Sequence, residues 1–322
     1  FIARARQARH DIDVDADAGT IRLICRELDS LPLALELAAA LVSTMSVADI
    51  GQGLERRFSL LRDEGREHRH STLAATVQWS YDLLDAREQR LFDRLSVFQS
   101  GFDLNGAVAV IGSTRPTPSA QVDALIRSLE SKSMLERAES VGAPRWTALE
   151  TIREFGDRHL AERGERATAR NMHLEHMMSV ASLAGAVCRG EQWSEGVRRF
   201  RLEWDNLRAA LDWAIGTQRS GDVDRILRDI MFMARWTLES EPARWADRAI
   251  ERSASTGMTL GAPAHLLAAF GHFVVGDREA ALTANLRAVE SLGTPSDRAW
   301  ARHYAAIELL YLGRTAAAAA MA

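Results

Sequence analysis

The stretch LDSLPLALELAAALV, Leu28–Val42, contains an apolar run that Pro32 opens and in which Glu36 carries the only charge. Proline is well tolerated in the first turn of a helix, because its missing N–H would be unpaired there. A helix with one side in water carries more charges than this along its polar face. The stretch therefore predicts a helix that starts at Pro32 and is covered on most of its circumference.

The bulk composition is typical of a globular chain with more than one domain. The 322 residues are enough for two or three domains of roughly 100–200 residues each, and 47% of them are hydrophobic and 26% charged. No apolar run reaches the length of about 18 residues that a transmembrane helix needs, so no membrane contact is expected. Because the chain opens at Phe1 and stops within RTAAAAAMA, we expect it to be a piece of a longer protein.

Charge and cysteine content exclude several classes of site. The net charge is −4 without a basic stripe, so no direct contact with nucleic acid is expected. Cys25 and Cys188 match no metal or redox spacing and predict two small buried residues in a reducing, cytoplasmic setting.

The only lysine, Lys132, lies in ESKSM. A Walker A loop needs a second glycine where Ser131 stands and a Gly-rich turn after a strand, so that backbone N–H groups can approach the phosphates. This piece is therefore predicted to hold no ATP or ADP by itself. No Ser/His/Asp, Cys/His or paired-carboxylate arrangement for catalysis is visible either.

Nearly every segment has helical periodicity. Asp85 and Glu88 form a capping-box-like start for a helix whose buried stripe includes Phe92. Helices are predicted near 1–9, 17–29, 46–58, 72–84, 86–98, 103–111 and 119–132, with a loop at 62–71, Ser71 or Thr72 as a cap, and Gly101 as a helix end. Alternation in MLERAE (134–139) and RWTALE (145–150) around a Gly/Pro turn predicts a β-hairpin. Three helices followed by a hairpin is the order of a winged helix.

The carboxyl-terminal part has a weak repeat. Gly276 and Gly313 precede Ala-rich helices 37 residues apart, and Ala269, Ala281 and Ala288 stand where helix pairs of tetratricopeptide type need small residues. The predicted fold class is mainly α: a helical domain, a winged helix with one β-hairpin, and an α-superhelix of tetratricopeptide-like repeats.

The chain resembles a known group in five motifs that occur in the same order. These are ICRELDSLPLALELAAA, RHSTLAATVQWSYDLLDAREQRLFDRLSVFQSGFDL, LIRSLESKSML, ALETIREFG and EWDNLRAALDWA. The group is the bacterial STAND-class ATPase regulators, which are related to NB-ARC ATPases and often described as LuxR-type or SARP-type transcriptional regulators. The resemblance covers roughly residues 1–215.

The resemblance implies a helical domain at 1–65, a winged helix at 66–165 and a truncated helical-repeat sensor at 166–322. It also implies an upstream P-loop ATPase core in the same chain, ATP or ADP bound to that core, and a protein or small-molecule ligand on the repeats. The function implied is a regulatory and sensor part of an ATP-dependent switch in transcription.

In similar proteins a G-x-P motif at the head of the apolar helix lies against the adenine and ribose of the nucleotide. Leu31 and Pro32 are the matching residues here, and Ser30 replaces the usual glycine. We expect this departure to be mild, because serine is a good N-cap.

A second departure concerns the hairpin. NB-ARC relatives carry a Met-His-Asp triplet there, and its histidine touches the bound diphosphate. Glu150 and Thr151 stand in the matching places, and a carboxylate repels a phosphate unless a cation lies between them. The role is therefore not assigned to Glu150, and Arg153 is a weak substitute.

Other polar groups have simpler interpretations. His68 and His70 predict a solvated loop, with phosphate contact as the alternative, and His173 and His176 have the spacing of a metal pair without a third ligand. Trp204, Leu207 and Leu211 form a packing stripe, beside which Asp205 and Asn206 are expected to bond locally.

Two further functions remain open on the sequence. One is a helical-repeat scaffold that binds protein partners. The other is a winged-helix DNA-binding factor, against which Asp123 and Glu130 argue, because they would face phosphates on the candidate recognition helix. The polar residues of that face are Gln121, Asp123, Arg127, Ser128, Glu130 and Ser131.

Overall fold

The computed structural model describes residues 1–9, 12–14, 16–62, 68–112, 117–139 and 142–321, without the side chains of 55–62 and 68–71. The part that it describes is mainly α-helical with one small antiparallel sheet, which confirms the predicted fold class. The chain forms two compact units, Phe1–Ala169 and Arg170–Ala322. No helix in the described residues is both long enough and apolar enough to cross a bilayer.

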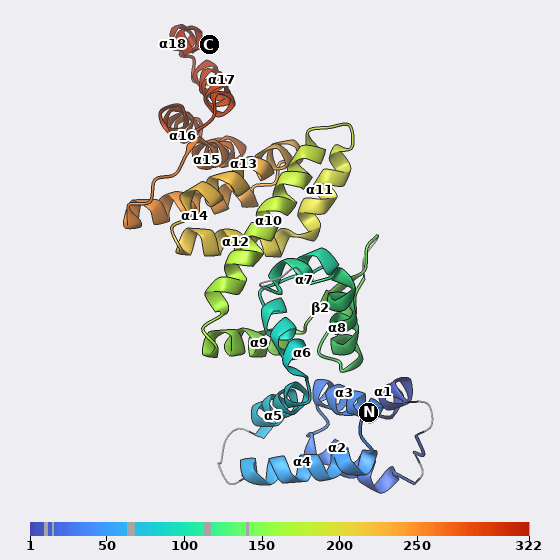
Figure 1. Cartoon of the computed structure of the whole chain (residues 1–322). Coiled ribbons are helices and arrows are strands. Elements are labelled where there is room, and N and C mark those ends of the chain that lie inside the picture. Colours follow the sequence, from blue (N-terminus) through green and yellow to red (C-terminus); the bar gives the residue numbers. More distant parts are fainter. Residues whose placement is uncertain (10–11, 15, 63–67, 113–116, 140–141, 322) are drawn as a thin grey trace. The chain divides into compact units, whose positions relative to one another are not determined.

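Unit 1 contains a run of helices, a hairpin and a closing helix (Figure 1). Its elements are α1 (Ile2–Ala8), α2 (Ala18–Glu27), α3 (Pro32–Ala40), η1 (Leu41–Ser43), α4 (Val47–Arg62), α5 (His68–Asp82), α6 (Ala86–Leu95), α7 (Leu104–Val110), α8 (Ser119–Ser131), β1 (Glu136–Ala138), β2 (Arg145–Thr147) and α9 (Glu150–Glu162).

Unit 2 consists of helices only, as far as the structure describes it. They are α10 (Arg166–Cys188), which begins just before the unit boundary, α11 (Trp193–Leu202), α12 (Trp204–Gly216), α13 (Ser220–Thr237), α14 (Glu241–Thr256), α15 (Ala262–Val275), α16 (Arg278–Glu290), α17 (Pro295–Tyr311) and α18 (Thr315–Met321).

Helix α3 starts at Pro32, as the apolar run predicts. Its residues Ala34, Leu37 and Ala38 are fully buried, and the helix packs against α1 and α5. Pro32 and Glu36, four residues apart, lie on its exposed strip. The helix is therefore covered on most sides but open along one line that begins at the proline.

The winged-helix order of three helices and a hairpin is present in α6, α7, α8, β1 and β2. The strands pair antiparallel with Arg137 opposite Trp146, and Phe102 adds an isolated bridge to Trp146. The predicted capping box is confirmed, because the Asp85 and Glu88 side chains each accept a backbone N–H of the other residue. The strands are three residues long, since ALE at 148–150 leads into α9 instead.

Three local predictions are wrong. Helix α4 runs for 16 residues rather than one short stretch, and α5 begins at His68, so Thr72 lies inside it and caps nothing. Helix α6 ends at Leu95, well before Gly101. Gly101 instead has φ +95 and lets the chain pass the Trp146 carbonyl, which a Cβ would approach to 2.8 Å.

The repeat region packs neighbouring helices through small residues. Helices α14 to α18 contact one another in chain order, and the predicted small positions Ala269, Ala281 and Ala288 are buried. Gly276 and Gly313 take left-handed φ values of 85 and 74 at the ends of α15 and α17, where glycine has no Cβ penalty. These glycines therefore end one helix and lead into the next.

Candidate functional site

The turn before α3 has an unusual backbone. Asp29 and Ser30 both have left-handed φ values, 51 and 54, which cost a residue with a Cβ roughly 1–2 kcal/mol. The Asp29 N–H donates to the Arg26 carbonyl and the Ser30 N–H to the Cys25 carbonyl. These two bonds form a Schellman motif that ends α2.

This geometry corrects the interpretation of Ser30. Its hydroxyl does not cap the start of α3, because the N-cap there is Leu31, which has an extended backbone and no side-chain cap bond. The hydroxyl instead donates to the Cys25 carbonyl at the end of α2, at 3.5 Å. A left-handed position favours glycine, so the Gly-to-Ser departure has a conformational cost and is not mild. Leu31 is half-buried and packs on the core, whereas Pro32 is exposed. Their contact with a nucleotide stays a prediction.

The same turn is tied to α5. The Thr72 hydroxyl is buried and donates to Asp29 Oδ2 at 3.1 Å. Helix α5 packs on α3 and on α4, where the Trp79 ring lies so close to Gly53 that a Cβ there would come within 2.8 Å. The start of α3 is therefore mechanically linked to the helix that leads into the winged-helix part.

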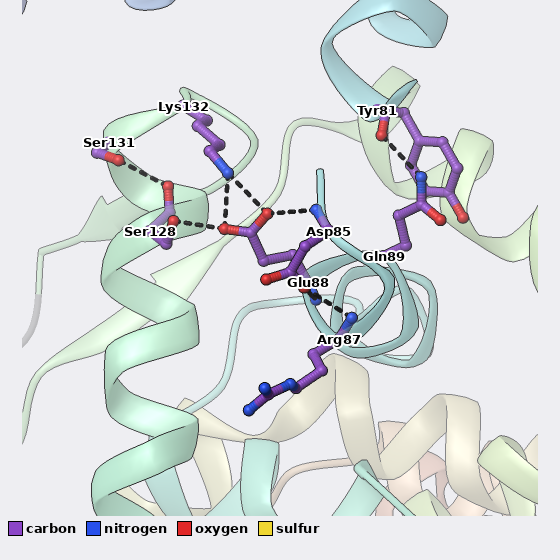
Figure 2. A network of polar contacts seen from close by, with 8 residues as sticks. All are labelled: Tyr81, Asp85, Arg87, Glu88, Gln89, Ser128, Ser131 and Lys132. Atoms are coloured by element: carbon purple, nitrogen blue, oxygen red, sulfur yellow. Dashed lines mark hydrogen bonds and ion pairs between the residues drawn. The ribbon is translucent and has the colours of Figure 1, made fainter. Parts of the chain in front are cut away.

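The only lysine makes a buried ion pair between α6 and the end of α8. Lys132 Nζ donates to both Glu88 oxygens at 2.6 and 2.7 Å, the Ser128 hydroxyl donates to Oε1 at 2.5 Å, and the Asp85 N–H donates to Oε2 at 2.7 Å. Figure 2 shows these donors around one carboxylate. Burial alone would raise the pKa of Glu88, but these hydrogen bonds outweigh it and lower the pKa.

This network was missed by the sequence reasoning, which used Lys132 only against a Walker A loop. Glu88 is 6% exposed and Lys132 20% in their side chains, and they are 44 residues apart. The available signal for a special role of Lys132 was that it is the single lysine in an arginine-rich chain. Its partner could not be named, because long-range pairing leaves no local pattern.

The charged residues on the polar face of α8 pair with other residues of α8 and of the hairpin. Asp123 pairs with Arg127 at 2.8 Å, and Glu130 accepts the Trp146 indole N–H at 3.0 Å and pairs with Arg137. Glu130 therefore holds the hairpin, and Arg127 already has a carboxylate. The remaining candidate residues are Gln121, exposed, Ser128, bonded to Glu88, and Ser131, bonded to the Ser128 carbonyl.

A second buried network joins α5, α6 and the end of α9. The Tyr81 hydroxyl donates to Asp93 Oδ2 at 2.9 Å, and Arg163 donates to that hydroxyl at 2.9 Å and pairs with Oδ2 at 3.2 Å. The Tyr81 ring stacks on His159 with centroids 4.4 Å apart. Burial raises the pKa of Asp93 to about 6 and also raises the pKa of Tyr81. On α6, Asp93 lies opposite the apolar stripe that contains Phe92, so its burial left no local signal in the sequence.

After the hairpin, where the sequence departs from the NB-ARC triplet, the charge of Glu150 is neutralised by Arg153. Arg153 donates to both oxygens of Glu150, at 2.5 and 3.2 Å, and to the Ser96 carbonyl at 3.4 Å. The Arg153 side chain is 15% exposed. Any phosphate would have to compete with Glu150 for this guanidinium.

The remaining candidates are separate from these networks. The predicted loop at His68 and His70 is wrong, because both residues lie in the first turn of α5; their side chains are outside those that the structure describes. His173 is fully buried, and burial lowers its pKa to about 3, while His176 is half-exposed; among the described residues no group of three metal-binding side chains exists. The local bonding expected of Asn206 is confirmed by its bond to Glu203.

The remaining predicted residues have the following places. Asp205 pairs with Arg208, Leu207 and Leu211 are buried and Trp204 is half-buried, Cys188 is buried and Cys25 is half-buried, and Thr151 is exposed.

The chain is similar to mycobacterial proteins. It is 36% identical over 200 residues, 62% of this chain and 22% of the relative, to a Mycobacterium tuberculosis protein named "Putative HTH-type transcriptional regulator", and equally to a Mycobacterium bovis protein of that name. It is 38% identical over 180 residues, 55% of this chain and 46% of the relative, to an uncharacterized M. tuberculosis protein. The chain thus spans less than half the length of these curated relatives. No family model matches it, and no solved structure matches it significantly.

Proposed function

We propose that the chain is the regulatory part of an ATP-dependent transcriptional regulator of the STAND class, related to NB-ARC ATPases and of LuxR or SARP type. Two observations support this: the five motifs in family order and the similarity to proteins named as HTH-type transcriptional regulators. In this proposal an upstream P-loop core of the same chain holds ATP or ADP. The helical repeats, of tetratricopeptide type, bind a protein or small-molecule ligand.

The observation that carries the proposal is the start of α3. Pro32 is exposed at the head of a helix whose other sides are mostly buried. Its ring is rigid and has no N–H that would need a partner, so a purine could lie against it without leaving a polar group unpaired. Leu31, half-buried beside it, would extend the apolar contact. The strained turn at Asp29 and Ser30 fixes where this surface points.

A route from this surface to the winged helix exists within unit 1. The Asp29–Thr72 hydrogen bond joins the turn to α5, and Tyr81 at the other end of α5 joins α6 and α9 through Asp93 and Arg163. A nucleotide that favours one position of α3 would shift the preferred position of α5. Such coupling requires only that the ligand bind the two arrangements with different affinity.

The test uses Pro32→Ala in a longer protein that includes the upstream core. Losing part of the apolar face should weaken nucleotide binding by about 1–2 kcal/mol, on the order of tenfold. The fold should survive because alanine favours helix. The matched control is Pro295→Ala, since Pro295 is also exposed and also at the first position of its helix.

Nucleotide affinity and the thermal midpoint without nucleotide are measured for both variants. We expect only Pro32→Ala to lose affinity. If both variants lower the midpoint and neither changes affinity, Pro32 is merely a helix starter, and the nucleotide assignment is wrong.

The two alternatives have different support. A scaffold function is favoured by large apolar side chains exposed on the repeats: Trp236 at 69%, Val275 at 76% and Tyr311 at 65%. Absence of nucleotide binding by the longer protein would favour that function. DNA binding by α8 is disfavoured, because Asp123 and Glu130 already hold Arg127 and the hairpin.

A further inference from the structure

A cavity of about 460 Å³ lies between the start of α6 and the first half of α8. It opens to solvent, because Arg87, Arg90 and Gln121 in its lining are exposed. The described residues that line it come from the first turns of α6, the residue after α7, the segment just before α8 and the first half of α8: Ala86, Arg87, Arg90, Ile111, Thr117, Gln121, Ala124 and Leu125. No function argued above uses this space.

One wall of the cavity is positively charged. Arg87 and Arg90 are three residues apart on α6, so they lie on one face of the helix, and both are exposed. Neither guanidinium forms an ion pair with any described residue, whereas the nearby Arg127 pairs with Asp123. The pKa of the exposed Asp85 is lowered mainly by backbone hydrogen bonds, and the charge of Arg87 adds to this effect. Figure 2 shows Arg87 extending away from the Glu88 carboxylate. None of the described residues that line the cavity is acidic.

The other wall is apolar. Ile111 and Leu125 are half-buried, and Ala86 and Ala124 are small and exposed, so they leave room rather than fill it. Gln121 and Thr117 add neutral polar groups at the rim. Two unpaired guanidiniums thus face a water-accessible apolar surface within one enclosure.

We propose that this cavity binds a small organic anion, a carboxylate or sulfonate on an apolar body. Its volume lies in the range of about 300–1,000 Å³ typical of small-molecule sites, which combine apolar walls with a few placed polar groups. Arginine is suited to planar anions because its donors form a fixed fork. A DNA backbone would use the arginines and leave the apolar wall wet. This inference does not depend on nucleotide binding.

The probe for the test is anilinonaphthalene sulfonate, which joins one anion to an aromatic body and fluoresces when its body leaves water. Phenylnaphthylamine, the same body without the sulfonate, is the neutral counterpart. The full chain is titrated with each probe as wild type, as Arg87→Gln/Arg90→Gln, as Ala124→Phe, which fills the cavity, and as Arg127→Gln, which removes an equal kind of charge outside it.

The anionic probe should have one saturable component that Ala124→Phe removes and that Arg87→Gln/Arg90→Gln weakens about tenfold or more, the loss expected for two charge-assisted contacts. Arg127→Gln should leave it within about twofold, as for an exposed charge outside the site. The neutral probe should lose its component with Ala124→Phe and keep it with the arginine pair replaced. Because the wanted signal is a difference between variants, probe bound elsewhere cancels.

Three results would overturn the proposal. The first is an anionic component that survives replacement of both arginines. The second is the lack of any component removed by Ala124→Phe, or by Gln121→Trp if the first variant loses helical content. The third is salt-sensitive binding of duplex DNA through Arg87 and Arg90 without a probe site, which would make this face a nucleic-acid contact.

Discussion

Two helix pairs of this molecule are held together in opposite ways. Between α6 and α8, Glu88 and Lys132 form an ion pair with a nearly buried carboxylate. Between α14 and α15, the contact is a glycine against an alanine: a Cβ on Gly271 would lie 2.7 Å from that of Ala243. The first contact depends on the charged groups of Glu88 and Lys132, and the second on the lack of a Cβ at Gly271.

The difference decides how each pair responds to change. A buried ion pair suffers most when one partner is removed, because the other charge stays in a poor solvent, and suffers less when both are replaced. A close glycine contact does not tolerate an added methyl group, because the packed interior has no space for it and the backbone must shift. Repeat packing of this kind also confines damage to neighbouring helices.

The largest expected effect is in the α6–α8 pair. Lys132→Met should cost roughly 3 kcal/mol of unfolding free energy, because Glu88 stays buried without its cation. Urea unfolding, together with hydrogen exchange of peptides from α6 and α8, measures the loss.

The matched variant is Glu88→Gln/Lys132→Met, which removes both charges and should recover much of that stability. Equal losses in the single and double variants would mean that the unpaired charge of Glu88 is not what destabilises the Lys132→Met variant.

A smaller effect is expected in the α14–α15 pair. Gly271→Ala should cost about 2 kcal/mol, because the added methyl meets Ala243 and the helices must separate. Hydrogen exchange should show the loss in α14 and α15 and leave unit 1 unchanged. The control is Gly221→Ala in α13, where no atom lies within 4 Å of the added Cβ and a gain of about 0.4–1 kcal/mol is expected. If Gly271→Ala also raised the stability, the close contact with Ala243 would not matter, and both substitutions would act only through the higher helix propensity of alanine.

The effect that is smallest over one pH unit is a slope of stability with pH that comes from Asp93. Its pKa is raised from 3.8 to about 6 by burial, so between these values the folded state holds a proton that the unfolded state has lost. Stability should therefore fall as pH rises from 4 to 6, by up to about 1.4 kcal/mol per pH unit, and stay level above.

Asp93→Asn keeps an acceptor for Tyr81 and cannot titrate, so its stability should lack this slope. Chemical unfolding at several pH values, compared with wild type, measures it. A variant as steep as wild type would show that another group titrates in this window.

Local patterns predicted those parts of the molecule that local physics determines. The start of α3 at Pro32 and the capping box at Asp85 and Glu88 each depend on residues within one turn, and both are confirmed. The strained turn at Ser30 was misjudged, because serine favours both caps and turns and only the backbone angle distinguishes them. The nucleotide contact itself stays a prediction.

The contacts across the fold could not be predicted. Glu88 and Lys132 were each noticed for a local reason, a cap and a missing P-loop, and their meeting depends on how α6 and α8 pack. The same holds for Arg163, which reaches Tyr81 from 82 residues away. The cavity beside Arg87 likewise depends on how α6 and α8 pack, with the small residues Ala86 and Ala124 in its lining.

A chain with one lysine offers a chemical reporter. Apart from the terminal amine, Lys132 is the only primary amine among these 322 residues, and its nitrogen is held by Glu88. The Lys132 side chain is only 20% exposed, so acylating reagents should reach its nitrogen faster when α6 and α8 part. The rate at which this one side chain is acylated therefore times the opening of the winged helix, without any engineered label.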